Sequence, residues 1–491
     1  MRFWSAFLVL LLVGGAVGGG GWYLEHEAGL HTVRALEGGP LGTGAPSGAW
    51  YCPHGGGPAG WSANLSITNP GDREVAVRVR DMTKKGSADP RDLTVPPRTR
   101  ISVNVPADHR EASTEVEYFG GWVAAGWVAV ATGERTGPAP SPSPAVGGES
   151  GTPGQAVERG VAAEPCVPAA GRTWILPDGT TSQGEEAFVI VMNPFATEAV
   201  FDLSWVAEGR VVDAGDLTLR GNTSVAVRVN KPGGGRPGVV GERTVTALVT
   251  ASIGRVAAAS LGITDEGGIR STEGATETAR LLVFPGAAGA GRTEVPMVNP
   301  GDAGLSYGVD ALKPAGRQSI RPGDQDLAPE ASVTETVTIG GPAALEVTSD
   351  GGESGRGGMA AARRSLGLRG DQGATLGQAP GTAWLLTSPA SDGRDVVNIV
   401  LANPGRAPVR VTLSAITPEG PIGDSQDVTV PPGVSLSAPV DFLAGHGQAS
   451  VVAVSAGGAF VAAETSTAVA GSGYSVAAGV PIPPRWVPAA P

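Results

Sequence analysis

The sequence is poor in the residues on which most catalytic and metal sites depend. Among 491 residues there are 2 Cys and 5 His. Nucleophilic catalysis needs a nucleophile beside a base that a third group orients, and zinc sites need clustered Cys and His. His54 stands alone in "WYCPHGGG", without a phosphate-loop pattern, and reads as a turn residue after a strand. We therefore expect no catalytic residue, no metal and no cofactor, and a protein that is not an enzyme.

Clustered positive charge is also scarce. The net charge is −12, and the densest basic stretch, 356–369, is rich in Gly and has no interleaved aromatic residues. A nucleic-acid surface needs clustered Lys and Arg. We interpret this stretch as a solvated loop and expect no nucleic-acid partner.

Long apolar runs are absent except at the start of the chain. Residues 3–24 carry no charge, with Arg2 before them and Glu25 and Glu27 after them. About 20 such residues span a bilayer, and the charge order places the N-terminus in the cytoplasm. Residues 1–24 are therefore predicted to be a single-pass transmembrane helix whose partner is the lipid bilayer, with the remaining chain extracytoplasmic. The alternative is a signal peptide that is cleaved near Gly15–Gly18 and leaves a secreted protein.

Glycine and proline are abundant, at 76 and 41 residues, and they punctuate a repeated pattern. Four segments carry a strand into an Asn-Pro corner, at Asn69, Asn193, Asn299 and Asn403. Trp50, Trp174 and Trp384 stand 19 residues before their Asn, whereas Leu282 stands 17 residues before Asn299. A second landmark lies 26 to 28 residues after each Asn, as in Val95-Pro96-Pro97, and an Ala-rich strand closes each copy.

The local pattern of each copy is typical of β-structure. In "VAVRVR", Val75, Val77 and Val79 share one face of a strand and Arg78 and Arg80 the other. Asn-Pro-Gly is turn chemistry. Copies of this length suit immunoglobulin-like sandwiches. The fold class is thus all-β, with tandem immunoglobulin-like β-sandwich units after an N-terminal transmembrane helix.

The boundaries follow from the landmarks and from the linkers rich in Pro, Ser and Gly. The predicted segments are the anchor 1–24, a linker 25–47, unit 1 at 48–135, a linker 136–165, unit 2 at 166–268, unit 3 at 278–368, unit 4 at 380–480 and a tail strand 481–491. Each Trp strand could complete its own unit or the preceding one. The tail, which repeats the Trp motif at Trp486, could then clamp neighbouring units or close the four into a ring.

The two cysteines, Cys52 and Cys166, are expected to form a disulfide, because a Cys pair outside the cytoplasm tends to oxidise. On these boundaries the bond would tie unit 1 to unit 2.

Unit 1 holds the richest group of aromatic residues. Aromatic rings on a surface stack against sugars, so Trp61, Trp122 and Trp127 are candidate ligand contacts. Trp122 and Trp127 differ by five positions, so a regular strand would turn them to opposite faces and expose one. Core packing is the alternative for all three.

These motifs resemble the uncharacterised domain family 5719, found in exported proteins of high-GC Gram-positive bacteria. The resemblance covers about residues 48–480 and rests on the Trp-x-x-Pro start, Asn-Pro-Gly, Val-Pro-Pro and the Ala-rich strand. It implies a fold and no activity. We expect a non-catalytic, membrane-anchored cell-envelope protein with a structural role or an interaction role, whose partners are envelope proteins. The alternative is a cell-wall polysaccharide-binding module that uses the aromatic residues of unit 1.

Overall fold

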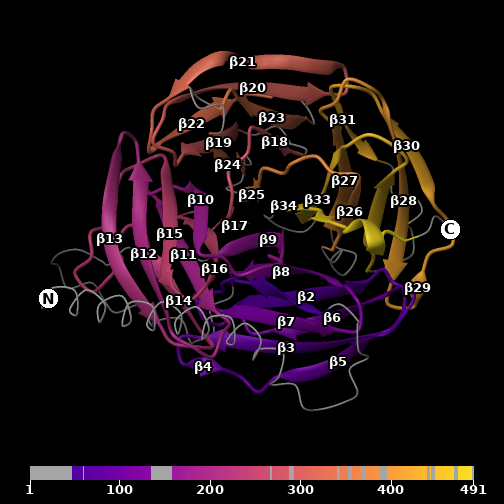
Figure 1. The fold of residues 1–491 in the computed structure, drawn as a ribbon, viewed down its shortest axis with the longest axis horizontal. Coiled ribbons are helices and arrows are strands. Elements are labelled where there is room, and N and C mark those ends of the chain that lie inside the picture. The colour runs from indigo at the N-terminus through magenta and orange to yellow at the C-terminus, as the bar shows by residue number, and fades with distance from the viewer. Residues whose placement is uncertain are drawn as a thin grey trace, which may run out of the picture. The chain divides into compact units, whose positions relative to one another are not determined.

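The computed structural model describes residues 47–58, 60–133, 158–265, 268–286, 292–339, 343–351, 357–366, 372–387, 395–438, 443, 448–468 and 474–488. The predicted anchor 1–24, nearly all of the linker 25–47 and most of the linker 136–165 lie outside these residues. The described residues form strands and a single-turn 3-10 helix, η2 (Pro484–Trp486). They confirm an all-β fold with several antiparallel sheets (Figure 1).

Units 1 and 2 each contain two antiparallel sheets. The strands of unit 1 are β1 (Gly48–Cys52), β2 (Trp61–Asn69), β3 (Val75–Thr83), β4 (Gly86–Ser87), β5 (Arg91–Val95), β6 (Thr99–Val105), β7 (Ser113–Phe119), β8 (Ala124–Thr132) and β9 (Arg159–Pro165). The strands of unit 2 are β10 (Thr173–Gly179), β11 (Glu185–Asn193), β12 (Ala199–Ala207), β13 (Arg210–Leu219), β14 (Thr223–Arg228), β15 (Val245–Ile253), β16 (Ala257–Thr264) and β17 (Ile269–Glu273). The sheet orders of unit 2 are β10-β15-β12-β13 and β14-β11-β16-β17.

Units 3 and 4 repeat this arrangement. The strands of unit 3 are β18 (Leu281–Phe284), β19 (Arg292–Asn299), β20 (Leu305–Lys313), β21 (Gly316–Leu327), β22 (Ala331–Val337), β23 (Ala344–Ser349), β24 (Ala360–Leu366) and β25 (Gln372–Leu376). The strands of unit 4 are β26 (Ala383–Leu386), β27 (Asp395–Asn403), β28 (Val409–Thr417), β29 (Gly420–Pro421), β30 (Gln426–Val430), β31 (Val434–Ala438), β32 (Ser450–Ser455), β33 (Val461–Ala468), β34 (Tyr474–Ala478) and β35 (Val480–Pro481).

Units 1, 2 and 3 end later than the sequence predicted. β9 pairs with β8, β17 with β16 and β25 with β24, so three final strands lie in ranges that were read wholly or partly as joints. Residues 159–165 in particular belong to unit 1 and are not linker. The reason is composition, because strands such as "IRSTE" and "QGATL" are short and polar and resemble joints.

The first strand of each unit pairs within its own unit, which resolves the two alternatives for the Trp strands. Trp50 in β1 pairs with Val116 in β7, for example. A residue two positions after the last strand then bridges back to the first strand, as Val167 does to Tyr51. The indole N–H groups of Trp50, Trp174 and Trp384 donate to the carbonyl groups that precede the Ala-rich strands, at 2.6, 2.7 and 2.9 Å.

The Asn-Pro corners fix the two halves of each unit to each other. Asn69 is fully buried, and its Nδ2 donates to the carbonyl groups of Arg73 (2.7 Å) and Val95 (3.1 Å), while its Oδ1 accepts from the Gly71 N–H. The same three contacts recur at Asn193, Asn299 and Asn403. In each unit the corner Asn bonds to a carbonyl group 26 to 28 residues later in the sequence. This contact explains why the spacing between the Asn and the second landmark is nearly constant.

The cores lie between the two sheets of each unit, as the strand alternation predicts. Val75, Val77 and Val79 are buried, whereas Arg78 and Arg80 are only partly buried on the opposite face. The cores also continue across unit boundaries. Ile482 of the tail and Leu385 of unit 4, for example, join the core of unit 1.

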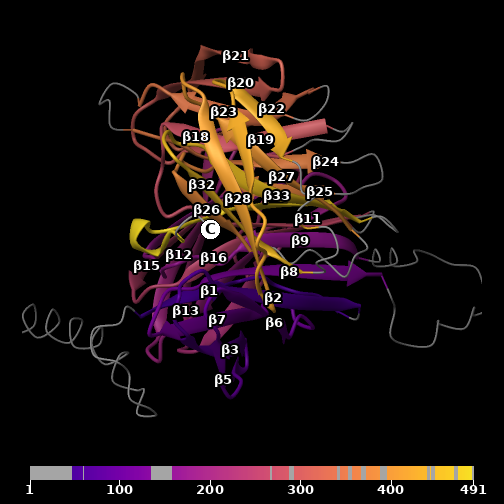
Figure 2. The same ribbon diagram turned by 90° about the vertical axis from the view of Figure 1, so that its right-hand side faces the viewer.

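The four units meet through equivalent strands and close on themselves. β14 of unit 2 packs on β3 of unit 1, β22 on β12, β31 on β20, and β6 of unit 1 on β28 of unit 4. The last strands β9, β17, β25 and β34 contact one another in cyclic order near the centre of Figure 1, and Figure 2 shows β9 beside β8 from the side. The tail adds β35 to β26 of its own unit, and Trp486 packs against Gly71 of unit 1. We call the contact between units 4 and 1 the closing junction.

Candidate functional site

A buried ionic cluster joins units 2 and 3. Nε of Arg270, on β17, donates to Oδ2 of Asp178 at 3.2 Å, and Nε of Arg364, on β24, donates to Oδ1 of the same carboxylate at 2.8 Å. Nη1 of Arg364 also donates to Oε2 of Glu294, on β19, at 2.9 Å. The four side chains are at most 4% exposed. One carboxylate from β10 is thus held by arginines of two different units.

The electrostatics of this cluster favour the charged forms of Glu294 and Arg270. Burial alone would raise the pKa of Glu294, but Arg364 and Arg292 outweigh it and the pKa falls below its usual range. Burial would lower the pKa of Arg270, but Asp178 and Glu185 outweigh it and the pKa rises. Charge-assisted hydrogen bonds between arginine and carboxylate groups are short and geometrically specific. The cluster therefore connects units 2 and 3 through buried ion pairs.

This cluster corrects our interpretation of the basic stretch 356–369. Arg363 and Arg364 are 1% and 2% exposed in β24, and they do not lie in a solvated loop. Nη1 of Arg363 donates to the carbonyl groups of Phe284, Gly286 and Ala343 at 2.9–3.3 Å. One feature of the sequence could have indicated burial of these arginines. They interrupt an Ala-rich strand, and the equivalent strands of the other units carry mostly small or apolar residues there.

Glu164 is a second buried charge-bearing group, on the central strand β9. It is 1% exposed, and neither carboxyl oxygen has a hydrogen-bond partner among the described residues. Burial raises the pKa of Glu164 well above its usual value, and the nearby Glu273 and Asp178 raise it further. Its surroundings therefore favour the protonated form of this carboxyl group.

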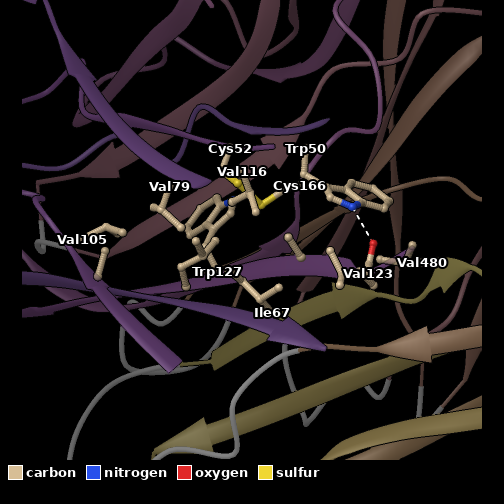
Figure 3. Close-up of a cluster of buried hydrophobic side chains, with 14 of the residues drawn as sticks. Trp50, Cys52, Ile67, Val79, Val105, Val116, Val123, Trp127, Cys166 and Val480 are labelled. Carbon is tan, nitrogen blue, oxygen red and sulfur yellow. Dashed lines mark hydrogen bonds between the residues drawn. A yellow bond between two sulfur atoms is a disulfide. The ribbon is translucent and has the colours of Figure 1, made fainter. Parts of the chain in front are cut away.

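Two of the three candidate ligand contacts are core residues. Trp122 is 5% exposed and packs edge-on against Trp50, with ring centroids 6.2 Å apart. Trp127 is 2% exposed and lies among Val79, Val116 and the disulfide (Figure 3). The prediction that one of them is exposed is wrong, because Trp122 precedes β8 and is not held to the alternation of that strand.

Trp61 is partly buried and already engaged. Its indole N–H donates to Oε2 of Glu158 at 2.6 Å, and the guanidinium carbon of Arg110 lies 5.7 Å from its ring centroid. Arg110 also lies over Phe188 of unit 2, at 5.1 Å. Trp61, Trp122 and Trp127 therefore form part of a core and a junction, and within the described residues they do not make an exposed sugar-binding platform.

The disulfide between Cys52 and Cys166 is present, with Cα atoms 4.6 Å apart. It confirms the pairing but corrects its role. Cys52 ends β1, and the N–H of Cys166 donates to the carbonyl of Ala125 in β8, so both residues belong to unit 1. The bond closes unit 1 on itself and does not tie it to unit 2.

His54 is fully buried beside this bond. Its Nδ1 lies 2.7 Å from the carbonyl of Gly55 and its Nε2 lies 3.1 Å from the Thr114 hydroxyl. Burial lowers the pKa of His54 to about 4, so the ring is neutral at physiological pH. Within the described residues no group of His, Cys, Asp and Glu has the arrangement of a metal site.

No helix of the described residues is long and apolar enough to cross a membrane. The predicted membrane span, residues 3–24, lies outside that part of the chain.

Comparisons with known proteins give a family and no activity. No curated protein matches the chain. Among solved structures, the crystal structure of Thermotoga maritima 1070 is 17% identical, with 22% of this chain and 96% of that chain covered and a TM-score of 0.19, a likeness too weak to support an argument. A model of a family of unknown function, DUF5719, matches residues 129–373, from β8 of unit 1 to β25 of unit 3. Over these residues the chain belongs to the family of unknown function DUF5719.

Proposed function

We propose that the protein is a non-catalytic component of the cell envelope, anchored in the membrane by residues 3–24, whose four-unit body serves as a structural or interaction platform outside the cytoplasm. The observation that carries this proposal is the use made of the buried polar side chains. Asp178, Arg270, Arg364 and Glu294 join two units to each other, and the corner asparagines hold each unit together. These buried polar residues thus hold the folded structure together, which supports a structural role for them.

Two further features support the location. The Cys52–Cys166 bond suits an oxidising compartment. The uncharged segment 3–24, with Arg2 before it and acidic residues after it, suits an anchor with the N-terminus inside. In the same proposal each unit is an immunoglobulin-like sandwich, for which the support is two antiparallel sheets around a core of alternating valines.

Cell fractionation tests the anchor. The full-length chain should sediment with membranes and require detergent for release, and protease added to cells without a wall should degrade residues beyond 47. A variant in which residues 3–24 are replaced by a cleavable signal peptide should appear in the soluble exported fraction. Full-length protein in the soluble exported fraction, shortened at its N-terminus, would favour the secreted alternative.

Co-purification tests the platform. Detergent-solubilised full-length protein, crosslinked in cells, should retain envelope proteins through the outer surface of the units. The matched control is the same chain with both Cys52 and Cys166 changed to Ser, which lacks the disulfide of unit 1. Turnover of any cell-wall substrate by the purified protein would contradict the non-catalytic proposal.

A further inference from the structure

The closing junction differs from the other three junctions at one equivalent position. The second residue of the junction strand is Ser224 in β14, Ser332 in β22 and Ser435 in β31, but Arg100 in β6. The positions are equivalent by pairing, because each lies opposite the residue that precedes the corner Asn. A small hydroxyl is therefore replaced by a long cation where the last unit meets the first.

Two of the three serines use their hydroxyl groups across the junction. Ser224 donates to the carbonyl of Glu111 at 2.5 Å, and Ser332 donates to the carbonyl of Val206 at 2.8 Å. Both acceptors belong to the preceding unit. These serines thus satisfy their own polar group and one carbonyl of the neighbour.

Arg100 has no such arrangement. It is 1% exposed, and none of its three guanidinium nitrogens has a hydrogen-bond partner within the described residues. Burial lowers the pKa of Arg100 to about 10, and the carboxyl of Glu464 on β33 opposes this only in part. Burial likewise raises the pKa of Glu464 to about 8, and the charge of Arg100 limits that rise. A buried guanidinium whose donors are all unused is costly, so its presence needs an explanation.

Besides the carboxyl of Glu464, hydroxyl groups lie near Arg100. Thr68 lies directly opposite Arg100 on β2, and its hydroxyl contacts the hydroxyl of Ser450 in unit 4 at 2.6 Å. Ser66 lies two residues from Thr68 on the same face of β2, is fully buried, and its hydroxyl has no partner in the described part of the chain. A guanidinium and nearby hydroxyls with donors to spare are the chemistry of an anion site.

We propose that the closing junction binds a small inorganic anion of about the size of chloride, held by the guanidinium of Arg100 with help from the Ser66 hydroxyl. Size follows from burial, since neither side chain is open to solvent and the site lies between two packed sheets. The ion enters when units 4 and 1 separate locally and is retained when they close. Anion binding thereby favours the closed ring, because a ligand that binds one state stabilises that state.

Thermal unfolding of the full chain at constant ionic strength tests the proposal, with sodium chloride exchanged stepwise for sodium gluconate, whose anion is too large to enter. We expect the midpoint of the wild-type protein to rise by about 2 °C or more in chloride. Arg100→Ser, which gives this position the residue of the other junctions, should remove the dependence. Arg78→Ser, at a solvent-facing ion pair with Asp92, should retain it.

Two further measurements keep the proposal falsifiable if Arg100→Ser fails to fold. Wild-type crystals soaked in bromide should show an anomalous peak within hydrogen-bond distance of the Arg100 guanidinium, and the absence of a peak would overturn the site. Glu464→Gln should keep the chloride response. A response that appears only in Glu464→Gln would show that Glu464 is the counter-charge of Arg100 and would overturn the proposal, as would equal midpoints in chloride and gluconate.

Discussion

The corner asparagines and the residues at the junctions both occur once per unit. The corner residue is the same in every unit, whereas the residues at the junctions differ between units. The corner is Asn in all four units and makes the same three contacts. The second residue of the strand at each junction, by contrast, is Arg100 in unit 1 and Ser224, Ser332 and Ser435 in the other units. The buried ionic cluster around Asp178 joins units 2 and 3. What is repeated builds a unit, and what is not repeated selects its neighbour, since four interchangeable surfaces would leave the order of docking unspecified.

Breaking the buried ion pairs between units 2 and 3 should have the largest effect on stability. Asp178→Ala removes the carboxylate that both Arg270 and Arg364 use and leaves two buried cations without it. We expect a loss of about 3–5 kcal/mol in the free energy of unfolding, measured by urea denaturation. Asp92→Ala is the control, because its ion pair with Arg78 is at the surface and should cost less than about 1 kcal/mol. Equal losses would contradict the view that the buried cluster joins the units.

Breaking a corner should cost somewhat less and about the same in every unit. Asn193→Ala leaves the carbonyl groups of Thr197 and Leu219 without their donor, so we expect a loss of about 3 kcal/mol. The equivalent changes at Asn69, Asn299 and Asn403 test the sameness of the corners, and Asn64→Ala, at an exposed position on β2, is the control. A corner that tolerates Ala would show that the clamp is dispensable there.

The corners could be predicted from the sequence, and the junctions could not, for a physical reason. An Asn-Pro turn and an alternating strand are decided by neighbours a few residues away, so Asn69 and Val75–Val79 were interpreted correctly. Arg364 and Asp178 are 186 residues apart in sequence, and their pairing exists only because two units dock. Without the docked neighbour, Arg364 resembles part of a solvated basic loop.

Buried carboxyl groups at the junctions should make stability depend on pH. Burial raises the pKa of Glu464 to about 8, and burial together with Glu117 raises the pKa of Glu115 to about 8. Each carboxyl binds a proton more tightly in the folded state than in the unfolded one. Their contribution is therefore complete below about pH 4.5 and is lost as the pH rises toward 8.

Urea denaturation at pH 5.5 and pH 8.5 measures this effect, and the protein should be less stable at pH 8.5. Glu464→Gln, which stays neutral, should recover part of the difference, on the order of 2 kcal/mol. Glu186→Gln is the control, because its carboxylate pairs with Arg228 at a largely exposed site and should leave the pH profile unchanged. A profile of Glu464→Gln identical to that of the wild type would place the pH dependence elsewhere.

The smallest expected change in stability concerns the turn after the second landmark, where the backbone conformation is repeated but the residue is not. The turn after the second landmark places Arg98, Asn222, Glu330 and Gly433 at φ of 50°, 54°, 48° and 67°, so the backbone is the same although the residues differ. Only Gly adopts this region freely, so Arg98→Gly should stabilise the protein by about 0.5–1 kcal/mol. The reciprocal Gly433→Arg should destabilise it by a similar amount, measured as opposite shifts of the urea midpoint. Asn222→Gly should gain less, because Asn tolerates positive φ and its side chain accepts a hydrogen bond from Arg80. If Arg98→Gly is destabilising, the Arg98 side chain contributes to the closing junction. The turns after the second landmark would then not be equivalent in unit 1 and in the other units.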